Sequence, residues 1–273
     1  MTLAAVFLGL LLFGLPVAVV LGVSASVYIV ITDNTVLFQS YMLQLFGATE
    51  NYGLLAIPLF MLVGELMSAG GITARLVRAA SVAAGATRGG LVYVNLLANT
   101  MVASILGSAV AQIAVMSRVM VPEMAKQGYS RDFAAATTAA GGLLSPVIPP
   151  SMLFIIFGVI AQVSIGDMFL AGILPGVLML GGFVLAVRWL GRTHDYPRAE
   201  ALSQAQRRRY LVEGLPAAAI PGVILGSVLF GIATPTEAAA LAALVAVVLG
   251  RWYYRELDWA QAWRAVVQAG MRA

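Results

Sequence analysis

Residues 89–117 read GGLVYVNLLANTMVASILGSAVAQIAVMS, an apolar segment that Arg88 precedes and Arg118 follows. Lys and Arg gather on the cytoplasmic side of membrane proteins, so both ends of this segment are expected on the same face of a bilayer. Two full crossings need about 40 residues, and residues 89–117 number only 29. The sequence therefore predicts a re-entrant helical hairpin over about 89–121, with its tip at Gly107-Ser108.

The composition requires a bilayer. The chain of 273 residues is 61% hydrophobic and 10% charged, and its mean hydropathy is +0.93. Soluble domains carry about 25% charged residues, so a water-soluble globule, an aqueous enzyme and a nucleic-acid binder are all excluded. The absence of cysteine and the single histidine, His194, exclude a disulfide framework and a thiolate or histidine metal site.

The positive charges predict the topology. All sixteen Lys and Arg residues lie at or after Arg75, in clusters within 75–88, 118–131, 188–209 and 251–272. The net charge of +4 is therefore assigned to cytoplasmic anchoring rather than to a nucleic-acid partner.

A second interruption follows the hairpin. Residues 133–161 are long enough to span a membrane, but SPVIPPS occupies 145–151. Three prolines in this short run remove backbone donors and prevent continuous helical bonding. We expect a broken helix near the centre of the bilayer, with free carbonyl groups, and a simple proline kink is the weaker alternative.

The stretch 215–269 resembles the start of the chain in outline. Each has an apolar helix, a break marked by Pro16 or Pro235, a small-residue helix and an amphipathic stretch. The first amphipathic stretch, about 35–46, has no basic residue, whereas the second, about 258–271, contains Arg264. Opposite placement of matching elements indicates an inverted-topology repeat. It implies an outside N-terminus, two short helices within 1–33, and a second repeat of which only the opening is present.

Five motifs occur in order along the chain. They are IPLFMLVGELMSAGG at 57–71, GSAVAQ at 107–112, PVIPPS at 146–151, FLAGILPG at 169–176 and TPTEAAA at 234–240. In this order and spacing they resemble the large membrane subunit (M, DctM-like) of tripartite ATP-independent periplasmic (TRAP) transporters. The resemblance covers essentially all 273 residues and corresponds to the N-terminal two-thirds of that subunit.

The resemblance implies an all-α polytopic protein of the bacterial inner membrane that works as an elevator-type transporter. It implies sodium-coupled uptake of an organic acid, such as a dicarboxylate, delivered by a periplasmic substrate-binding protein, and a small partner membrane subunit. The expected domains are scaffold helices and an outer arm (1–53), a transport domain (54–187), a basic cytoplasmic loop (188–210) and the start of the second repeat (211–273).

The chain departs from the family pattern at the hairpin tip. Family members often read SGSAVAD there, whereas this sequence has Leu106 for the leading serine and Gln112 for the closing aspartate. The familiar glycine before the proline motif is Ser145. These changes put the usual side-chain contacts in doubt.

Sodium is the expected coupling ion, and no other cofactor is expected. Unwound backbone binds coupling ions in other transporters. The candidate ligands, mostly backbone carbonyls, are Gly107, Ser108, Ser145, Val147, Ile148 and Pro149. The alternative is that Ser108 and Ser145 merely bond to nearby backbone.

Four polar residues are candidates for a substrate cavity: Asn95, Asn99, Gln112 and Ser151. Asn95 and Asn99 lie four apart, hence on one helix face, and interhelical bonding explains them equally well. Thr234 and Glu237 have the spacing of a capping box, which favours a structural role.

The sequence leaves two alternatives to a binding-protein-dependent transporter. One is an ion-coupled organic-anion carrier that needs no binding protein. The other is a truncated membrane scaffold that binds partners and transports nothing. No metalloprotease, P-loop or nucleophile-elbow motif is present, so we expect no enzyme.

Overall fold

A computed structural model describes residues 2–84, 88–192, 196–197 and 202–272. All its regular elements are helices, and the chain divides into two compact units, 1–51 and 52–273. Four helical stretches in the described part are long and apolar enough to cross a membrane: 37–69, 165–190, 204–229 and 235–253.

The first unit contains three helices, α1 (Thr2–Leu12), α2 (Val17–Ile31) and α3 (Leu37–Thr49). The two short helices expected within 1–33 are therefore present, and Pro16 precedes the second of them. Val20, Ser24 and Ile29 of α2 are buried, whereas most of α1 and α3 is exposed. Such a large apolar surface requires lipid or protein around it.

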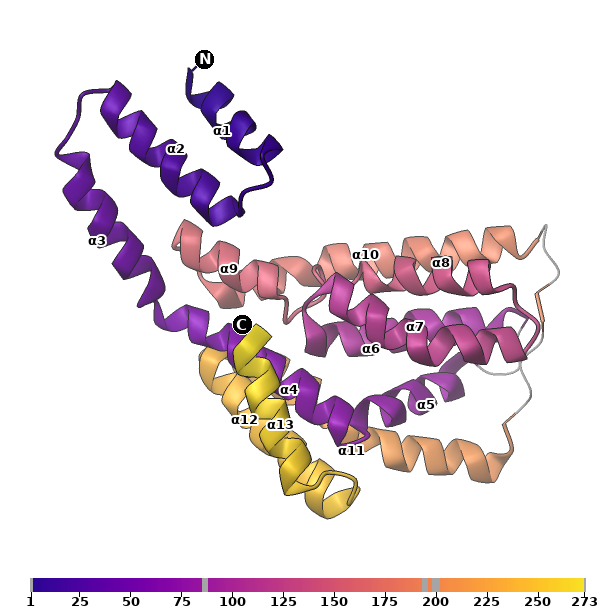
Figure 1. Cartoon of the computed structure of the whole chain (residues 1–273). Helices are drawn as coiled ribbons and strands as arrows, with labels where there is room; N and C mark the ends of the chain where they lie inside the picture. Colours follow the sequence, from indigo (N-terminus) through magenta and orange to yellow (C-terminus); the bar gives the residue numbers. More distant parts are fainter. Residues whose placement is uncertain (1, 85–87, 193–195, 198–201, 273) are drawn as a thin grey trace. The chain divides into compact units, whose positions relative to one another are not determined.

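The second unit begins with η1 (Tyr52–Leu55) and contains the remaining helices (Figure 1). These are α4 (Ala56–Ala69), α5 (Ile72–Ala84), α6 (Gly90–Leu106), α7 (Ala109–Lys126), α8 (Arg131–Gly142), α9 (Met152–Ala161), α10 (Ile165–Leu190), α11 (Gln204–Leu229), α12 (Pro235–Val248), η2 (Leu249–Tyr253) and α13 (Trp259–Arg272).

One hydrophobic core of this unit joins helices from its beginning and its end. α4 packs against α12 and α13, and α5 packs against α11. Alanines supply much of the packing face: Ala238, Ala239, Ala242, Ala243 and Ala246 of α12, and Ala262 and Ala265 of α13. Small side chains let helix backbones approach closely where no water drives their association.

The other core holds the helical hairpin together. α6, α7 and α8 pack on one another, and α10 contributes Val187. Met116, Met120 and Met124 of α7 are fully buried there, where flexible side chains can fill an irregular gap. The rings of Tyr129, Phe133 and Tyr196 stack at one end, with centroids 5.2–6.1 Å apart.

α11 begins earlier than the sequence analysis placed it. Ser203 and Gln206 form a capping box, so the helix starts at Gln204. Arg207–Arg209 therefore lie in the first turns of a helix, whereas the sequence analysis assigned them to a loop. The capping spacing was present in the sequence, but a run of arginines in a polar segment concealed it.

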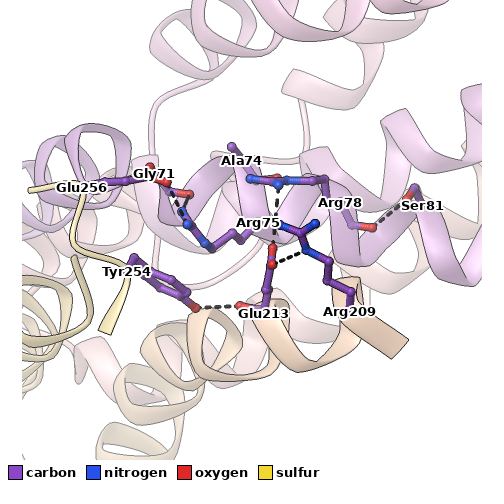
Figure 2. Close-up of polar contacts among 9 residues, drawn as sticks. All are labelled: Gly71, Ala74, Arg75, Arg78, Ser81, Arg209, Glu213, Tyr254 and Glu256. Carbon is purple, nitrogen blue, oxygen red and sulfur yellow. Dashed lines mark hydrogen bonds and ion pairs between the residues drawn. The ribbon is translucent and has the colours of Figure 1, made fainter. Parts of the chain in front are cut away.

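An ionic cluster joins α5, α11 and the residues after η2 (Figure 2). Arg75 Nη2 lies 2.7 Å from Glu256 Oε1, and its guanidinium sits 4.0 Å over the ring of Tyr254. The hydroxyl of Tyr254 donates to the Glu213 carbonyl at 2.6 Å. Arg75 is buried, so its charge needs these partners.

This cluster predicts an acid-sensitive contact. The Arg75 guanidinium holds the pKa of Glu256 below its usual range. The contribution of the Arg75–Glu256 ion pair to stability is therefore fully present above the ordinary pKa of a glutamate, about 4.3. It is lost as pH falls through the lowered pKa of Glu256. We expect the difference in melting temperature between the wild type and Glu256→Gln to disappear as pH falls below about 4. Glu50→Gln, at an exposed position outside the cluster, is the control. A constant difference down to pH 3 contradicts the assignment.

Two glycines of α10 accept the interrupted segment between α8 and α9. A Cβ at Gly172 would meet the Phe154 ring and lie 2.7 Å from the Val147 carbonyl oxygen, and one at Gly176 would lie 2.9 Å from Ile148 Cγ1. On the same helix, Gly182 faces open space.

Gly172→Ala should therefore destabilise the protein by about 1–3 kcal/mol, because the added methyl group overpacks a filled contact. Gly182→Ala should be neutral or stabilising by up to about 1 kcal/mol, since alanine favours a helix. Thermal unfolding in detergent measures both. Equal effects would mean that α10 does not pack tightly on the interrupted segment.

Candidate functional site

The hairpin turns within two residues. Gly107 has φ +59, and Ser108 is extended before α7 begins at Ala109. A Cβ on Gly107 would lie 3.0 Å from the backbone nitrogen of Met152 and 3.6 Å from the Pro150 carbonyl oxygen. Glycine is thus required both by its positive φ and by this close approach. The tip of the hairpin lies against the start of α9.

The helix expected over 133–161 is interrupted as predicted, between Gly142 and Met152. The N–H groups of Ser145 and Ile148 donate to carbonyls three and four residues back. The hydroxyl of Ser151 donates to the Pro146 carbonyl at 2.7 Å. The carbonyl oxygens of Ile148 and Pro149 accept no hydrogen bond from the described residues.

Ser145 lies at the start of this interruption with an unpaired side chain. It is fully buried, and its Oγ has no hydrogen-bond partner among the described residues. An unpaired buried hydroxyl costs about 1–3 kcal/mol. The Ser145 side chain therefore does not bond to nearby backbone in the described residues, and its role as a sodium ligand stays a prediction.

The other sodium candidates have different surroundings. Ser108 is half-buried next to the tip glycine. The Val147 carbonyl oxygen faces Gly172 of α10. Sequence reasoning missed Pro150, whose carbonyl is near the tip, because a turn contact between distant segments leaves no local signal.

The candidate cavity residues of the hairpin bond to one another. Gln112 Nε2 donates to the carbonyl and Oδ1 of Asn99 at 2.8 and 2.9 Å. Asn99 Nδ2 donates to Asn95 Oδ1 at 2.8 Å, and Asn95 Nδ2 donates to Thr138 Oγ1 at 2.8 Å. All four side chains are fully buried. This amide ladder ties both hairpin limbs to α8.

The ladder has one open end. Gln112 Oε1 is buried and accepts no hydrogen bond from the described residues. A Cβ on Gly141 of α8 would lie 2.8 Å from the Asn99 side chain. The glycine therefore leaves room for the ladder. Thr138 has no local sequence signal, because its partner Asn95 lies 43 residues away.

Two further residues singled out in the sequence, Glu237 and His194, lie in other regions. Thr234 Oγ1 accepts from the N–H of Glu237 at 3.3 Å, and Glu237 Oε2 accepts from the N–H of Thr234 at 2.8 Å, so a capping box starts α12. His194 lies outside the described residues, and so does the side chain of Leu106.

The ladder predicts unequal effects at two adjacent threonines. Thr138→Val should lower the free energy of unfolding by about 1–3 kcal/mol, because it removes the oxygen acceptor of the buried Asn95 amide and leaves only the weaker bond to Met124 Sδ at 3.6 Å. Thr137→Val is the matched control, since Thr137 Oγ1 donates to carbonyls of its own helix. Thermal unfolding in detergent compares them. Indistinguishable melting temperatures of the two variants would contradict a stabilising role of the bond between Asn95 and Thr138.

The chain matches known proteins along nearly its whole length. The family described as "Tripartite ATP-independent periplasmic transporter, DctM component" matches residues 4–273. The chain is 37% identical, over 271 residues, to the 2,3-diketo-L-gulonate TRAP transporter large permease protein YiaN of Escherichia coli strain K12. That alignment covers 97% of this chain and 63% of YiaN.

Two relatives from Vibrio cholerae are comparably similar. The sialic acid TRAP transporter large permease protein SiaM is 34% identical, with 92% of this chain and 58% of SiaM covered. The C4-dicarboxylate TRAP transporter large permease protein DctM is 33% identical, with 92% of this chain and 55% of DctM covered. The chain thus spans less than two thirds of the length of these relatives.

Proposed function

Since the chain belongs to the family of DctM components of tripartite ATP-independent periplasmic transporters, we propose that it moves an organic acid across a membrane by sodium-coupled secondary transport. Its several apolar helices make it a multi-pass membrane protein. The relatives named above are transporter permeases and not enzymes. In this proposal the membrane is the bacterial inner membrane.

The observation that carries the proposal is the contact between the hairpin tip and the interrupted helix. Gly107 lies against Pro150 and Met152, and the unpaired hydroxyl of Ser145 is buried in the same interruption. Unwound backbone carbonyls of this kind bind coupling ions in secondary transporters. The proposed sodium ligands are the Ser145 hydroxyl and the unbonded carbonyls of Ile148 and Pro149, with Gly107 and Ser108 at the tip.

The hairpin has the length that a re-entrant element needs. α6 has 17 residues and α7 has 18, so each limb is about 26 Å long at 1.5 Å per residue. In this proposal the hairpin enters and leaves the bilayer on the cytoplasmic face, and its tip lies at depth. The hairpin and the interrupted helix move together as the elevator, since the amide ladder binds α6 and α7 to α8.

The relatives support the proposed substrate class, and the family description as one component of a tripartite periplasmic transporter supports the proposed partners. The molecules in their names are 2,3-diketo-L-gulonate, sialic acid and C4-dicarboxylates, which all carry a carboxylate. The proposed substrate is therefore an organic acid. A periplasmic binding protein would deliver it, and a small membrane subunit would complete the membrane part.

Sodium binding is testable without those partners. A ligand that binds only the folded state raises the melting temperature. We expect sodium chloride to stabilise the purified chain more than potassium chloride at equal ionic strength. Ser145→Ala should remove the difference, because the site loses its side-chain ligand, and Ser117→Ala, a partly buried serine of α7, should retain it. Identical curves in both salts for the wild type would overturn sodium binding by this chain.

Uptake into liposomes separates the functional alternatives. Sodium-driven uptake that requires an added binding protein supports the proposal. Uptake without that protein indicates a binding-protein-independent carrier. Partner binding without uptake, once all three proteins are present, indicates a scaffold.

A further inference from the structure

A cavity of about 480 Å³ lies at the open end of the hairpin, away from its tip. Its walls come from one face of α5, the first turns of α6, the last turns of α7 and the start of α11. About 16 residues of α6 separate its lining residue Leu91 from Gly107, which is roughly 24 Å along a helix. The cavity is therefore distinct from the proposed sodium site.

One wall carries a cation that its neighbours do not neutralise. Three guanidinium groups and two carboxylates meet in the cluster of Figure 2. Arg75 pairs with Glu256 and Arg209 pairs with Glu213, both at 2.7 Å. In the described residues the one carboxylate within 4 Å of Arg78 is that of Glu213, at 3.7 Å, and Glu213 already has its short partner. Arg78 Nε donates to the Ala74 carbonyl at 3.4 Å. Arg78 lines the cavity and is the surplus charge.

Another part of the lining carries acceptors. Glu123 of α7 and Gln127, which directly follows α7, lie four residues apart and both line the cavity. Glu123 pairs loosely with Lys126 at 3.7 Å. Gln127 Oε1 is buried, and no described residue donates a hydrogen bond to it. A buried acceptor without a donor is unfavourable, so it favours a ligand that brings an N–H or O–H group.

The remaining lining suits the body of a small molecule. Val77, Leu91, Val94 and Met120 form an apolar floor. The volume lies in the range of small-molecule sites, which combine apolar walls with a few convergent polar groups. A carboxylate would meet Arg78, because guanidinium N–H groups form strong charge-assisted bonds with carboxylates.

We propose that this cavity is a second organic-acid site, selective for carboxylates that also carry a hydroxyl group. The carboxylate binds Arg78, and the hydroxyl donates to Gln127 Oε1. The elements that line the cavity carry basic residues of the 75–88, 118–131 and 207–209 clusters. Basic residues gather on the cytoplasmic side, so in this proposal the site lies on the face where an imported acid would leave. The ligand class rests on the proposed function, whereas binding itself does not.

L-Malate and succinate test the proposal, because they differ by one hydroxyl group. Binding to the purified chain is measured by calorimetry in potassium buffer without sodium, so that the sodium site does not contribute. Malate should bind about three- to tenfold more tightly than succinate, the effect of one hydrogen bond. Gln127→Met should reduce that ratio to about one. Gln268→Met on α13, far along the sequence and outside the cavity lining, should leave it unchanged.

Arg78→Gln tests the other end of the ligand. It should weaken malate and succinate equally, by about tenfold or more, because both lose the same charge-assisted bond. A melting temperature near that of the wild type confirms that the variant folds.

The proposal would be overturned if the wild type bound malate and succinate equally, or bound neither. It would also be overturned if Gln127→Met kept the wild-type ratio of the two affinities. These results are independent of uptake. Hydroxyl-selective binding without sodium-driven uptake leaves this site standing while the transport proposal fails. Sodium-driven uptake without hydroxyl-selective binding in potassium buffer supports the transport proposal and overturns this site.

Discussion

A helix that stops inside an apolar protein must satisfy its backbone polar groups without water. Between Gly142 and Met152 this chain does so in part, with tight turns and with the Ser151 hydroxyl. The hairpin tip packs against Met152. Among the groups without a hydrogen-bond partner in the described residues are the Ser145 hydroxyl and the carbonyls of Ile148 and Pro149. The hairpin tip and α10 pack against this interruption.

Glycines make these close approaches feasible. Gly107 brings the tip against the interrupted segment, Gly172 and Gly176 let α10 cover it from another side, and Gly141 leaves room for the amide ladder. The ladder then fixes both hairpin limbs to α8. These contacts hold the hairpin, α8 and α10 together around the interruption, and their joint movement is part of the proposed function.

Much of the fold follows from the sequence because its signals are local. Apolar length, the proline run at 146–150 and the turn at Gly107 predict the helices, the interruption and the hairpin that the structure contains. Thr234 and Glu237 form their cap for the same reason, since all the atoms lie within one turn.

Long-range pairing could not be predicted from one sequence. The bonds of Asn95 to Thr138 and of Arg75 to Glu256 join residues 43 and 181 positions apart. The apolar character of either segment does not select its partner. The bonds that join Asn95, Asn99 and Gln112 to one another and to Thr138 of α8 therefore became visible only in the structure. The open acceptors on Gln112 and Gln127 are visible only once every neighbour is placed.

The central claim is that the hairpin returns to the membrane face from which it came. Because the chain has no cysteine, single cysteines at Arg88, Lys126 and Val163 can be labelled with a membrane-impermeant maleimide in sealed vesicles of either orientation. The account predicts that the cysteines at 88 and 126 react only from the cytoplasmic side, and the cysteine at 163 only from the other. Reactivity of 88 and 126 from opposite sides would contradict it.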